Sequence, residues 1–157
     1  MHAFTFTWRD AAASRACIQT HMHTRESRLS QSEFWKLLED YKLFGKPIHL
    51  TEISVPSSPS FSSWRDFKPH VEAIKNARSN KNRQTIARKS NKKLEIYQAE
   101  YLRDFYTLAF SHPKVETLIY WSGSDLHEWR GTAAGLLDVE HKPKPAYTVL
   151  RDLIKKK

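Results

Sequence analysis

The chain has 157 residues, a length typical of one domain, and carries a formal net charge of +9. Hydrophobic residues make up 39% and aromatic residues 12%, which excludes a wholly disordered chain. A single cysteine, Cys17, excludes an intrachain disulfide and a thiolate metal cluster, and the longest apolar runs are far too short for a membrane span.

The first predicted unit is a strand followed by a helix. Residues 16–23 are predicted to form the strand. Ser30 and Glu33 have the spacing of a capping box, in which each side chain satisfies a free backbone N–H of the other residue. The helix that begins there has apolar residues at 34, 37, 38 and 41, and Gly45 is a predicted stop signal.

The second unit begins with a short β-branched strand at residues 47–55, closed by a Pro-Ser-Ser-Pro turn. A long variable stretch follows, with a weak helical pattern at 71–77. A second clear helix is predicted at 98–111, and His112-Pro113 ends it.

A basic segment, residues 75–93, lies inside that variable stretch and holds eight basic residues and no acidic ones. Such a run is usually a solvated loop. It could instead attract a phosphate backbone, but it lacks interleaved aromatic residues for base stacking. The solvated loop is favoured, so no nucleic-acid partner is expected.

The third unit is a strand at 115–121, a polar and aromatic loop at 122–144, and a helix at 145–154 that has proline in its first turn. Strands that alternate with helices indicate an α/β fold with a parallel sheet. A closed eightfold barrel needs about 250 residues, so three units predict only part of a TIM barrel.

Five motifs, in order, resemble the carboxyl-terminal part of the glycoside hydrolase family 10 endo-1,4-β-xylanases. They are IQTHMH at 18–23, PIHLTEI at 47–53, FYTLAFSHP at 105–113, WSGSDLHEWRG at 121–131, and AGLLD at 134–138 with KPAY at 144–147. The resemblance implies a partial (β/α)8 barrel containing about the last three βα units, strands 6 to 8. Residues 16–157 form this portion, and residues 1–15 remain unassigned.

The resemblance also implies the chemistry. In this family the Thr-Glu pair on the seventh strand carries the nucleophile, which corresponds to Glu52. A retaining glycosidase forms a covalent glycosyl-enzyme through one carboxylate, while a second carboxyl group protonates the leaving oxygen. Taken alone, Glu52 would be interpreted as a strand-end residue in a salt bridge. The expected substrate is xylan or a xylo-oligosaccharide, with no cofactor and no membrane partner.

Gln19 and His21 are two residues apart on a predicted strand, so their side chains point to the same side. If that side faces the barrel axis, both can hydrogen-bond Glu52, orient it and keep it ionised. His21 could instead be an ordinary core histidine. A zinc site made of His21, His23 and Glu52 is a weaker alternative, and no metal is expected.

Trp121 and Trp129 resemble two family tryptophans that line the substrate cleft, and Arg130 is assigned to substrate binding with them. Flat indole rings suit the C–H faces of pyranose sugars. Both could instead be core residues. Because Trp129 lies in a polar loop beside Arg130, it is expected to be the more exposed of the two.

Two departures from the family pattern affect the expected activity. The family's acid/base glutamate lies in an Asn-Glu pair near the end of the fourth strand, and the chain has no Asn-Glu dipeptide. Many members have an aspartate two residues after the nucleophile, where this chain has Ser54; an aspartate would help to hold a histidine charged, and a serine cannot. The 157 residues are therefore expected to be inactive alone.

Other expectations stay open. A non-catalytic remnant that binds carbohydrate, and less favourably a basic nucleic-acid-binding module, are the alternatives to a glycosidase fragment. The family is mostly exported, although residues 1–8 lack the basic-then-apolar layout of a secretory signal.

Overall fold

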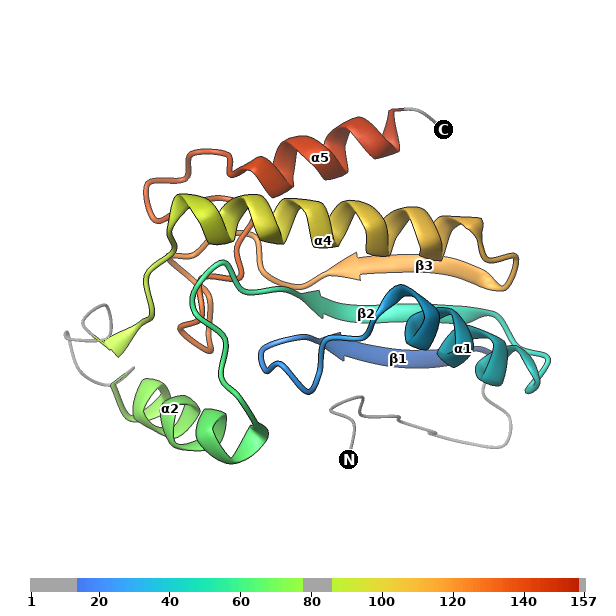
Figure 1. Cartoon of the computed structure of the whole chain (residues 1–157), viewed down its shortest axis with the longest axis horizontal. Coiled ribbons are helices and arrows are strands. Elements are labelled where there is room, and N and C mark those ends of the chain that lie inside the picture. The colour runs from blue at the N-terminus through green and yellow to red at the C-terminus, as the bar shows by residue number, and fades with distance from the viewer. Residues whose placement is uncertain (1–13, 78–85, 156–157) are drawn as a thin grey trace.

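The computed structural model describes residues 14–77 and 86–155. Its centre is a parallel three-stranded sheet in the order β1-β2-β3, as Figure 1 shows. The strands are β1 (Ala16–His21), β2 (Ile48–Ser54) and β3 (Val115–Tyr120). The helices are α1 (Gln31–Lys42), α2 (Trp64–Ala77), α4 (Lys92–Ser111) and α5 (Pro145–Ile154). The predicted alternation of parallel strands and helices is confirmed.

The capping box predicted at the start of α1 is present. The Ser30 hydroxyl accepts a hydrogen bond from the Glu33 backbone N–H at 3.3 Å, and the Glu33 carboxylate accepts one from the Ser30 backbone N–H at 2.8 Å. Two free donors of the first turn are thereby satisfied. The helix buries Phe34 and Leu38 against the sheet, as the apolar spacing predicts.

Two helices are longer than predicted. The weak pattern at 71–77 is the second half of α2, which begins at Trp64 and contains Pro69. Proline has no N–H for a helical hydrogen bond, so it weakens the sequence signal there. Helix α4 begins at Lys92, six positions before the predicted start, because Asn91 caps it by accepting from the Leu94 backbone N–H at 3.0 Å. Residues 78–85 of the basic segment lie outside the described residues.

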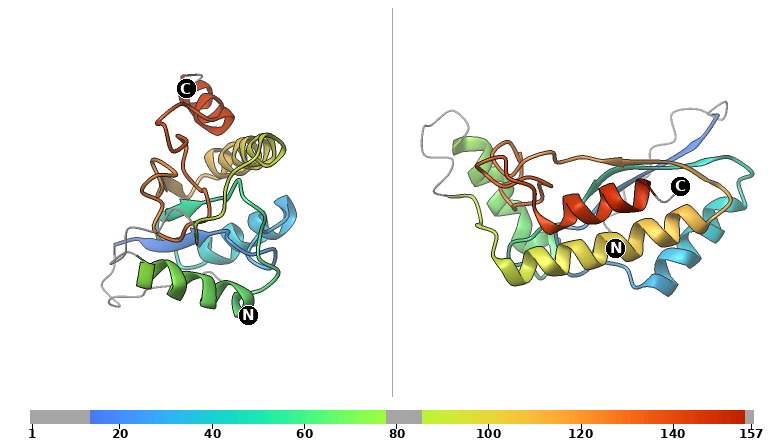
Figure 2. Two further views of the ribbon diagram at one scale, coloured as in Figure 1. Left: turned by 90° about the vertical axis from the view of Figure 1, so that its left-hand side faces the viewer. Right: turned by 90° about the horizontal axis from the view of Figure 1, so that it is seen from above.

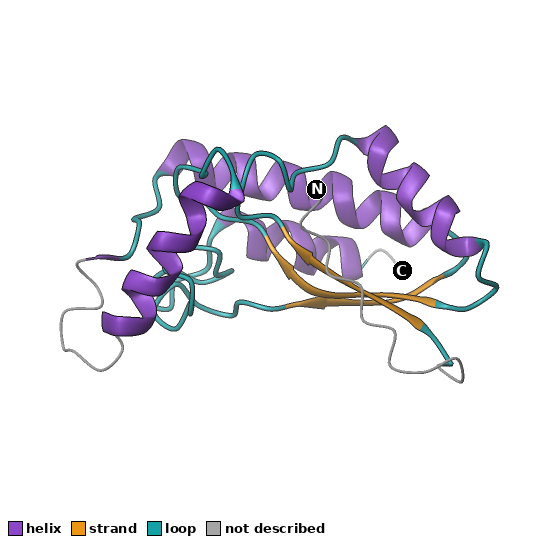
Figure 3. Cartoon of the chain, turned by 90° about the horizontal axis from the view of Figure 1, so that it is seen from below, coloured by secondary structure: helices purple, strands orange, loops and turns teal. Residues whose placement is uncertain are grey.

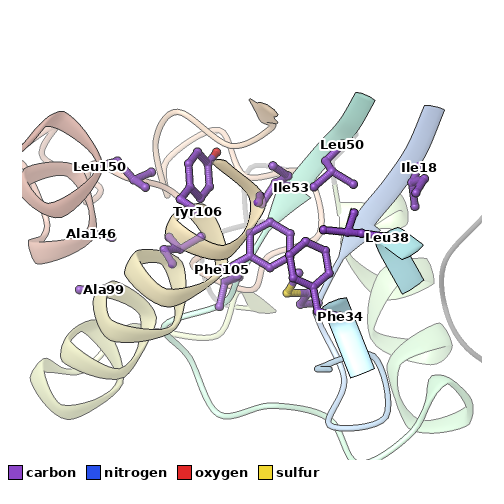
Figure 4. Packing of buried hydrophobic residues seen from close by; sticks show 14 of the residues in the cluster. Ile18, Phe34, Leu38, Leu50, Ile53, Ala99, Phe105, Tyr106, Ala146 and Leu150 are labelled. Atoms are coloured by element: carbon purple, nitrogen blue, oxygen red, sulfur yellow. The ribbon is translucent and has the colours of Figure 1, made fainter. Parts of the chain in front are cut away.

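The hydrophobic core lies between the sheet and the helices α1 and α4. Figure 4 shows Phe34 of α1 and Phe105 of α4 against each other, with ring centroids 4.2 Å apart. Ile18 of β1 and Leu50 of β2 are fully buried beneath them. Helix α5 packs on α4 and adds Leu150 to the same cluster. Burial of this one face fixes which strand residues point to the opposite face.

The opposite face of the sheet is open in the described part of the chain. Figure 3 shows α1 and α4 on one side of the strands and no described helix on the other. The partly exposed residues Cys17, Gln19, His49 and Thr51 pair across β1 and β2 on this face. Among residues 14–77 and 86–155, β1 and β3 each have a single neighbouring strand, so the sheet formed by these residues does not close on itself.

Helix α2 and the loop after β3 lie beyond the carboxyl ends of the strands (Figures 1 and 2). In parallel βα folds, functional side chains gather at this end of the sheet. Within the described residues, no helix has the length and apolar character that crossing a membrane requires.

Candidate active site

Glu52 lies near the carboxyl end of β2 with a left-handed backbone, φ 54°. A non-glycine residue rarely adopts this conformation, and such strain is often found at functional sites. The normal alternation of the strand is broken here: Thr51 and Glu52 are both partly exposed, and Ile53 and Ser54 are both buried. The strained residue therefore places its carboxylate on the open face, next to β1.

The two predicted orienting residues both contact this carboxylate. The Gln19 side-chain amide donates to Glu52 Oε1 at 2.6 Å, and His21 Nε2 lies 2.7 Å from Glu52 Oε2. In the β1–β2 register, Gln19 pairs with Thr51 and His21 pairs with Ser54, so the irregularity between them sets Glu52 between both side chains. The side chain of Glu52 is 23% exposed. The prediction that Gln19 and His21 reach Glu52 is confirmed.

His21 is held in its neutral form. Burial and the nearby Arg130 cation lower the pKa of His21 to about 4, although the hydrogen bond and the charge of Glu52 favour the protonated form. Burial has the larger effect because it removes the water that would stabilise an imidazolium. A neutral imidazole has one N–H to donate, and the carboxylate of Glu52 is its acceptor.

Three further residues, which the sequence did not assign to the site, extend the hydrogen bonding from His21 into the buried interior. The Ser54 hydroxyl lies 2.7 Å from His21 Nδ1 and 2.8 Å from His23 Nε2, and the Thr132 hydroxyl lies 2.9 Å from His23 Nδ1. Ser54 drew attention only as a departure from the family pattern. His21 and His23 are two residues apart, which indicates that their side chains point to the same side of the strand. Nothing in the sequence places Thr132 beside them.

The aromatic residues of the site flank His21. The rings of Trp121 and Trp129 each lie 6.4 Å from the His21 ring, with edge-to-face geometry. Trp121 is 49% exposed, whereas Trp129 is partly buried with the Arg130 guanidinium 4.2 Å above its ring. The expectation that Trp129 is the more exposed of the two is therefore wrong, because the stacked arginine covers it.

Arg130 is also more enclosed than the polar character of its loop suggests. Burial lowers the pKa of its guanidinium to about 10, against the opposing influence of Glu128 and Glu52. Its Nε is buried and makes no hydrogen bond within the described residues.

A buried ion pair fixes the loop that carries these tryptophans. The Lys144 ammonium lies 3.1 Å from Asp125 Oδ2 and donates to the Ser57 hydroxyl at 2.8 Å and to the Ala133 carbonyl at 3.1 Å. Burial lowers the pKa of Lys144 and raises that of Asp125, while each group partly offsets the effect on the other. This cluster joins the segment after β2, the loop after β3 and the start of α5.

The weaker zinc interpretation finds no support in this geometry. Both ring nitrogens of His21 and of His23 are taken up by hydrogen bonds to Glu52, Ser54 or Thr132. Among residues 14–77 and 86–155, no three His, Cys, Asp or Glu side chains are grouped so as to hold a metal ion.

A carboxylate thus lies at the carboxyl end of a parallel βα sheet, bonded to a histidine that is flanked by two tryptophans, and this is the end where the βα-barrel class gathers its functional side chains. The glycosyl hydrolase family 10 model matches residues 9–153, so the chain belongs to this family. The structure matches part of the family's TIM barrel. No curated protein sequence matches the chain.

Solved family members show how much of the barrel the chain spans. Xylanase 10B from Thermotoga petrophila RKU-1, in complex with xylobiose, is similar with a TM-score of 0.57 at 20% identity, over 82% of this chain and 32% of that one. Native xylanase 10B from Thermotoga maritima gives 0.57 at 21% identity, over 88% and 36%. A family 10 endoxylanase from a sugarcane soil metagenome gives 0.55 at 25% identity, over 80% and 36%. The chain thus spans about a third of the length of these relatives.

Proposed function

We propose that the chain is the carboxyl-terminal part of a retaining endo-1,4-β-xylanase, strands 6 to 8 of its barrel, with Glu52 as the nucleophile. The observation that carries the proposal is the contact of both Gln19 and His21 with the Glu52 carboxylate at the carboxyl end of the sheet. Two donors on one carboxylate stabilise its ionised form and fix the direction of its free lone pair.

In the proposed reaction a Glu52 oxygen attacks the anomeric carbon of a xylosyl unit as the glycosidic C–O bond breaks. The leaving oxygen takes a proton from a second carboxyl group about 5 to 5.5 Å away, and water later releases the sugar from Glu52. The chain has no Asn-Glu pair to supply that second group. A glycosidase without its general acid loses about 10² to 10⁴-fold in rate. We therefore expect little or no xylan hydrolysis by these 157 residues alone.

The proposal is tested with two substrates that differ in their need for an acid. Xylan requires a protonated leaving group, whereas a 2,4-dinitrophenyl β-xylobioside releases a stable anion without one. We expect turnover of the aryl glycoside to exceed that of xylan, and Glu52→Gln to abolish it. Glu116→Gln, which alters an exposed carboxylate on β3, is the matched control and should change nothing. Robust release of reducing sugar from xylan, lost in Glu52→Gln, would contradict the proposed lack of an acid.

A carbohydrate-binding role without turnover is the second candidate, and the 49% exposure of Trp121 favours it. The proposed ligand is a xylo-oligosaccharide stacked on Trp121 and contacted by Trp129 and Arg130. Calorimetric titration with xylohexaose should show binding that Trp121→Ala weakens about fivefold or more, since loss of a stacked ring costs about 1 kcal/mol or more. Trp64→Ala, which removes an exposed tryptophan on α2, is the control and should bind normally.

A further inference from the structure

A continuous line of hydrogen bonds leads from Glu52 into the buried interior. Its four links are Glu52 Oε2 to His21 Nε2 at 2.7 Å, His21 Nδ1 to Ser54 Oγ at 2.7 Å, Ser54 Oγ to His23 Nε2 at 2.8 Å, and His23 Nδ1 to Thr132 Oγ1 at 2.9 Å. His23, Ser54 and Thr132 are almost entirely buried. Water cannot easily replace a missing partner there, so each link needs its own proton.

When both histidines are neutral, these residues have one arrangement of protons in which each of the four hydrogen bonds has one donor and one acceptor. Ionised Glu52 only accepts, so the single N–H of His21 must be on Nε2, and its Nδ1 must accept from the Ser54 hydroxyl. That hydroxyl has no second hydrogen, so His23 must donate to Ser54 from Nε2. His23 Nδ1 then accepts from the Thr132 hydroxyl. Four protons fill four links, and every donor points towards Glu52.

We propose that Ser54, His23 and Thr132 are positioning residues that fix His21 as the neutral Nε2–H tautomer aimed at Glu52. The catalytic meaning of this order rests on the proposed role of Glu52 as nucleophile, whereas the order itself does not. Ser54 is the residue on which the order depends, because a hydroxyl can accept one proton and donate another at the same time.

The reverse arrangement of protons, with every donor pointing away from Glu52, is disfavoured by the contacts of Thr132 at the buried end of the line. Thr132 Oγ1 also lies 3.1 Å from Glu128 Oε2 and could donate there instead. His23 Nδ1 would then have to donate to Thr132, and His21 would have to donate from both nitrogens and become charged. Glu128 Oε2 already accepts the Thr132 backbone N–H at 2.6 Å, so it has less need of the hydroxyl proton.

The surrounding charges also favour neutral histidines. Arg130 faces both rings, and His23 is additionally near Arg28 and His70. Burial and Arg130 lower the pKa of each histidine, Arg28 and His70 add to the effect on His23, and only the contact with Glu52 opposes the effect on His21. These uncharged hydrogen-bond donors, all oriented towards Glu52, stabilise its carboxylate without placing a full positive charge beside it. A nucleophile held in this way keeps more of its reactivity than one in an ion pair.

The experiment reads the tautomers of the histidines in the full chain by ¹⁵N NMR, with no hydrolysis involved. At pH 7 we expect both His21 and His23 to carry hydrogen on Nε2 and none on Nδ1. In Ser54→Asp the new carboxylate has no proton to give, so His21 must donate from both nitrogens. Its pKa should rise from about 4 to above 6.5, while His23 keeps its Nε2–H.

The hydroxyl of Thr132 is tested with a matched pair. Thr132→Ser retains the donor and should give the wild-type spectrum, whereas Thr132→Val leaves His23 Nδ1 without a donor. The ¹⁵N signal of that Nδ1 should then shift downfield, while His23 keeps its Nε2–H because Ser54 still requires it. A wild-type His21 protonated on Nδ1 at pH 7, a Ser54→Asp spectrum in which His23 changes tautomer, or an unchanged His23 Nδ1 signal in Thr132→Val would each overturn the inference. If Ser54→Asp does not fold, the wild-type tautomers and the Thr132 pair still decide. Failure of xylan or aryl-glycoside turnover leaves these readouts intact, so the two proposals fail separately.

Discussion

At the scale of single residues, local spacing predicted the partners of Glu52 but not its backbone. Gln19 and His21 alternate on one strand, and that period was enough to direct both to the same carboxylate. The left-handed φ of Glu52 has no sequence signal, because β-strand patterns favour the opposite region. Thr132 was beyond prediction for another reason: it lies 109 positions from His23, and only the completed fold brings them together.

The lowered pKa of His21 predicts acid sensitivity. In the unfolded chain His21 titrates near 6.5 and in the folded chain at about 4, so the unfolded state binds more protons between these values. Stability is fully present above pH 6.5 and should fall by on the order of 3 kcal/mol as pH decreases from 6.5 to 4. Urea unfolding measured at pH 7 and pH 4.5 checks this. In a His21→Asn variant the free energy of unfolding should fall less between pH 7 and pH 4.5. An equally large fall in the variant would contradict the assignment of this pH dependence to His21.

At the scale of elements, helices with strong terminal signals were predicted well. The capping box fixes the start of α1, and the proline in its first turn fixes that of α5, whose bounds agree with the prediction. The start of α4 was placed too late, since Asn91 lies in a basic polar stretch that resembles a loop. The interior proline of α2 hid the first half of that helix.

The Asn91 cap provides a test of the longer α4. Replacing Asn91 with alanine leaves the Leu94 backbone N–H without its side-chain acceptor and should reduce the free energy of unfolding by about 1 kcal/mol. Asn91→Asp retains an acceptor and should be nearly neutral. Chemical denaturation of both variants makes the comparison, and equal stabilities would indicate that α4 begins elsewhere.

The buried pair of Lys144 and Asp125 should dominate the stability of the loop after β3. Lys144→Met leaves the Asp125 carboxylate buried without its cation, which typically costs about 3 to 5 kcal/mol. The control is Lys142→Met, which removes an exposed lysine paired with Glu140 and should cost at most about 1 kcal/mol. Thermal unfolding separates the two, and a similar small loss in both would show that the buried pair does not hold the loop.

At the scale of the whole molecule, the family and the parallel sheet could be predicted, because strand–helix alternation and the five motifs are properties of the chain itself. How the open face of the sheet is covered could not be predicted. Its polar residues Gln19, His49 and Thr51 lie where a closed barrel has its axis. The chain covers about a third of the solved relatives, and under the proposed function the second carboxyl group would lie in the part that it does not cover.

The most direct measurement of the central claim is mass spectrometry of the covalent sugar adduct formed from a 2,4-dinitrophenyl 2-deoxy-2-fluoro-β-xylobioside. The reactive leaving group bypasses the acid, and the fluorine slows hydrolysis of the adduct. We predict one fluoroxylobiosyl group per chain, located on Glu52 after proteolysis and absent from Glu52→Gln. An adduct on any other residue, or equal labelling of Glu52→Gln, would contradict the claim that this strained carboxylate is the nucleophile.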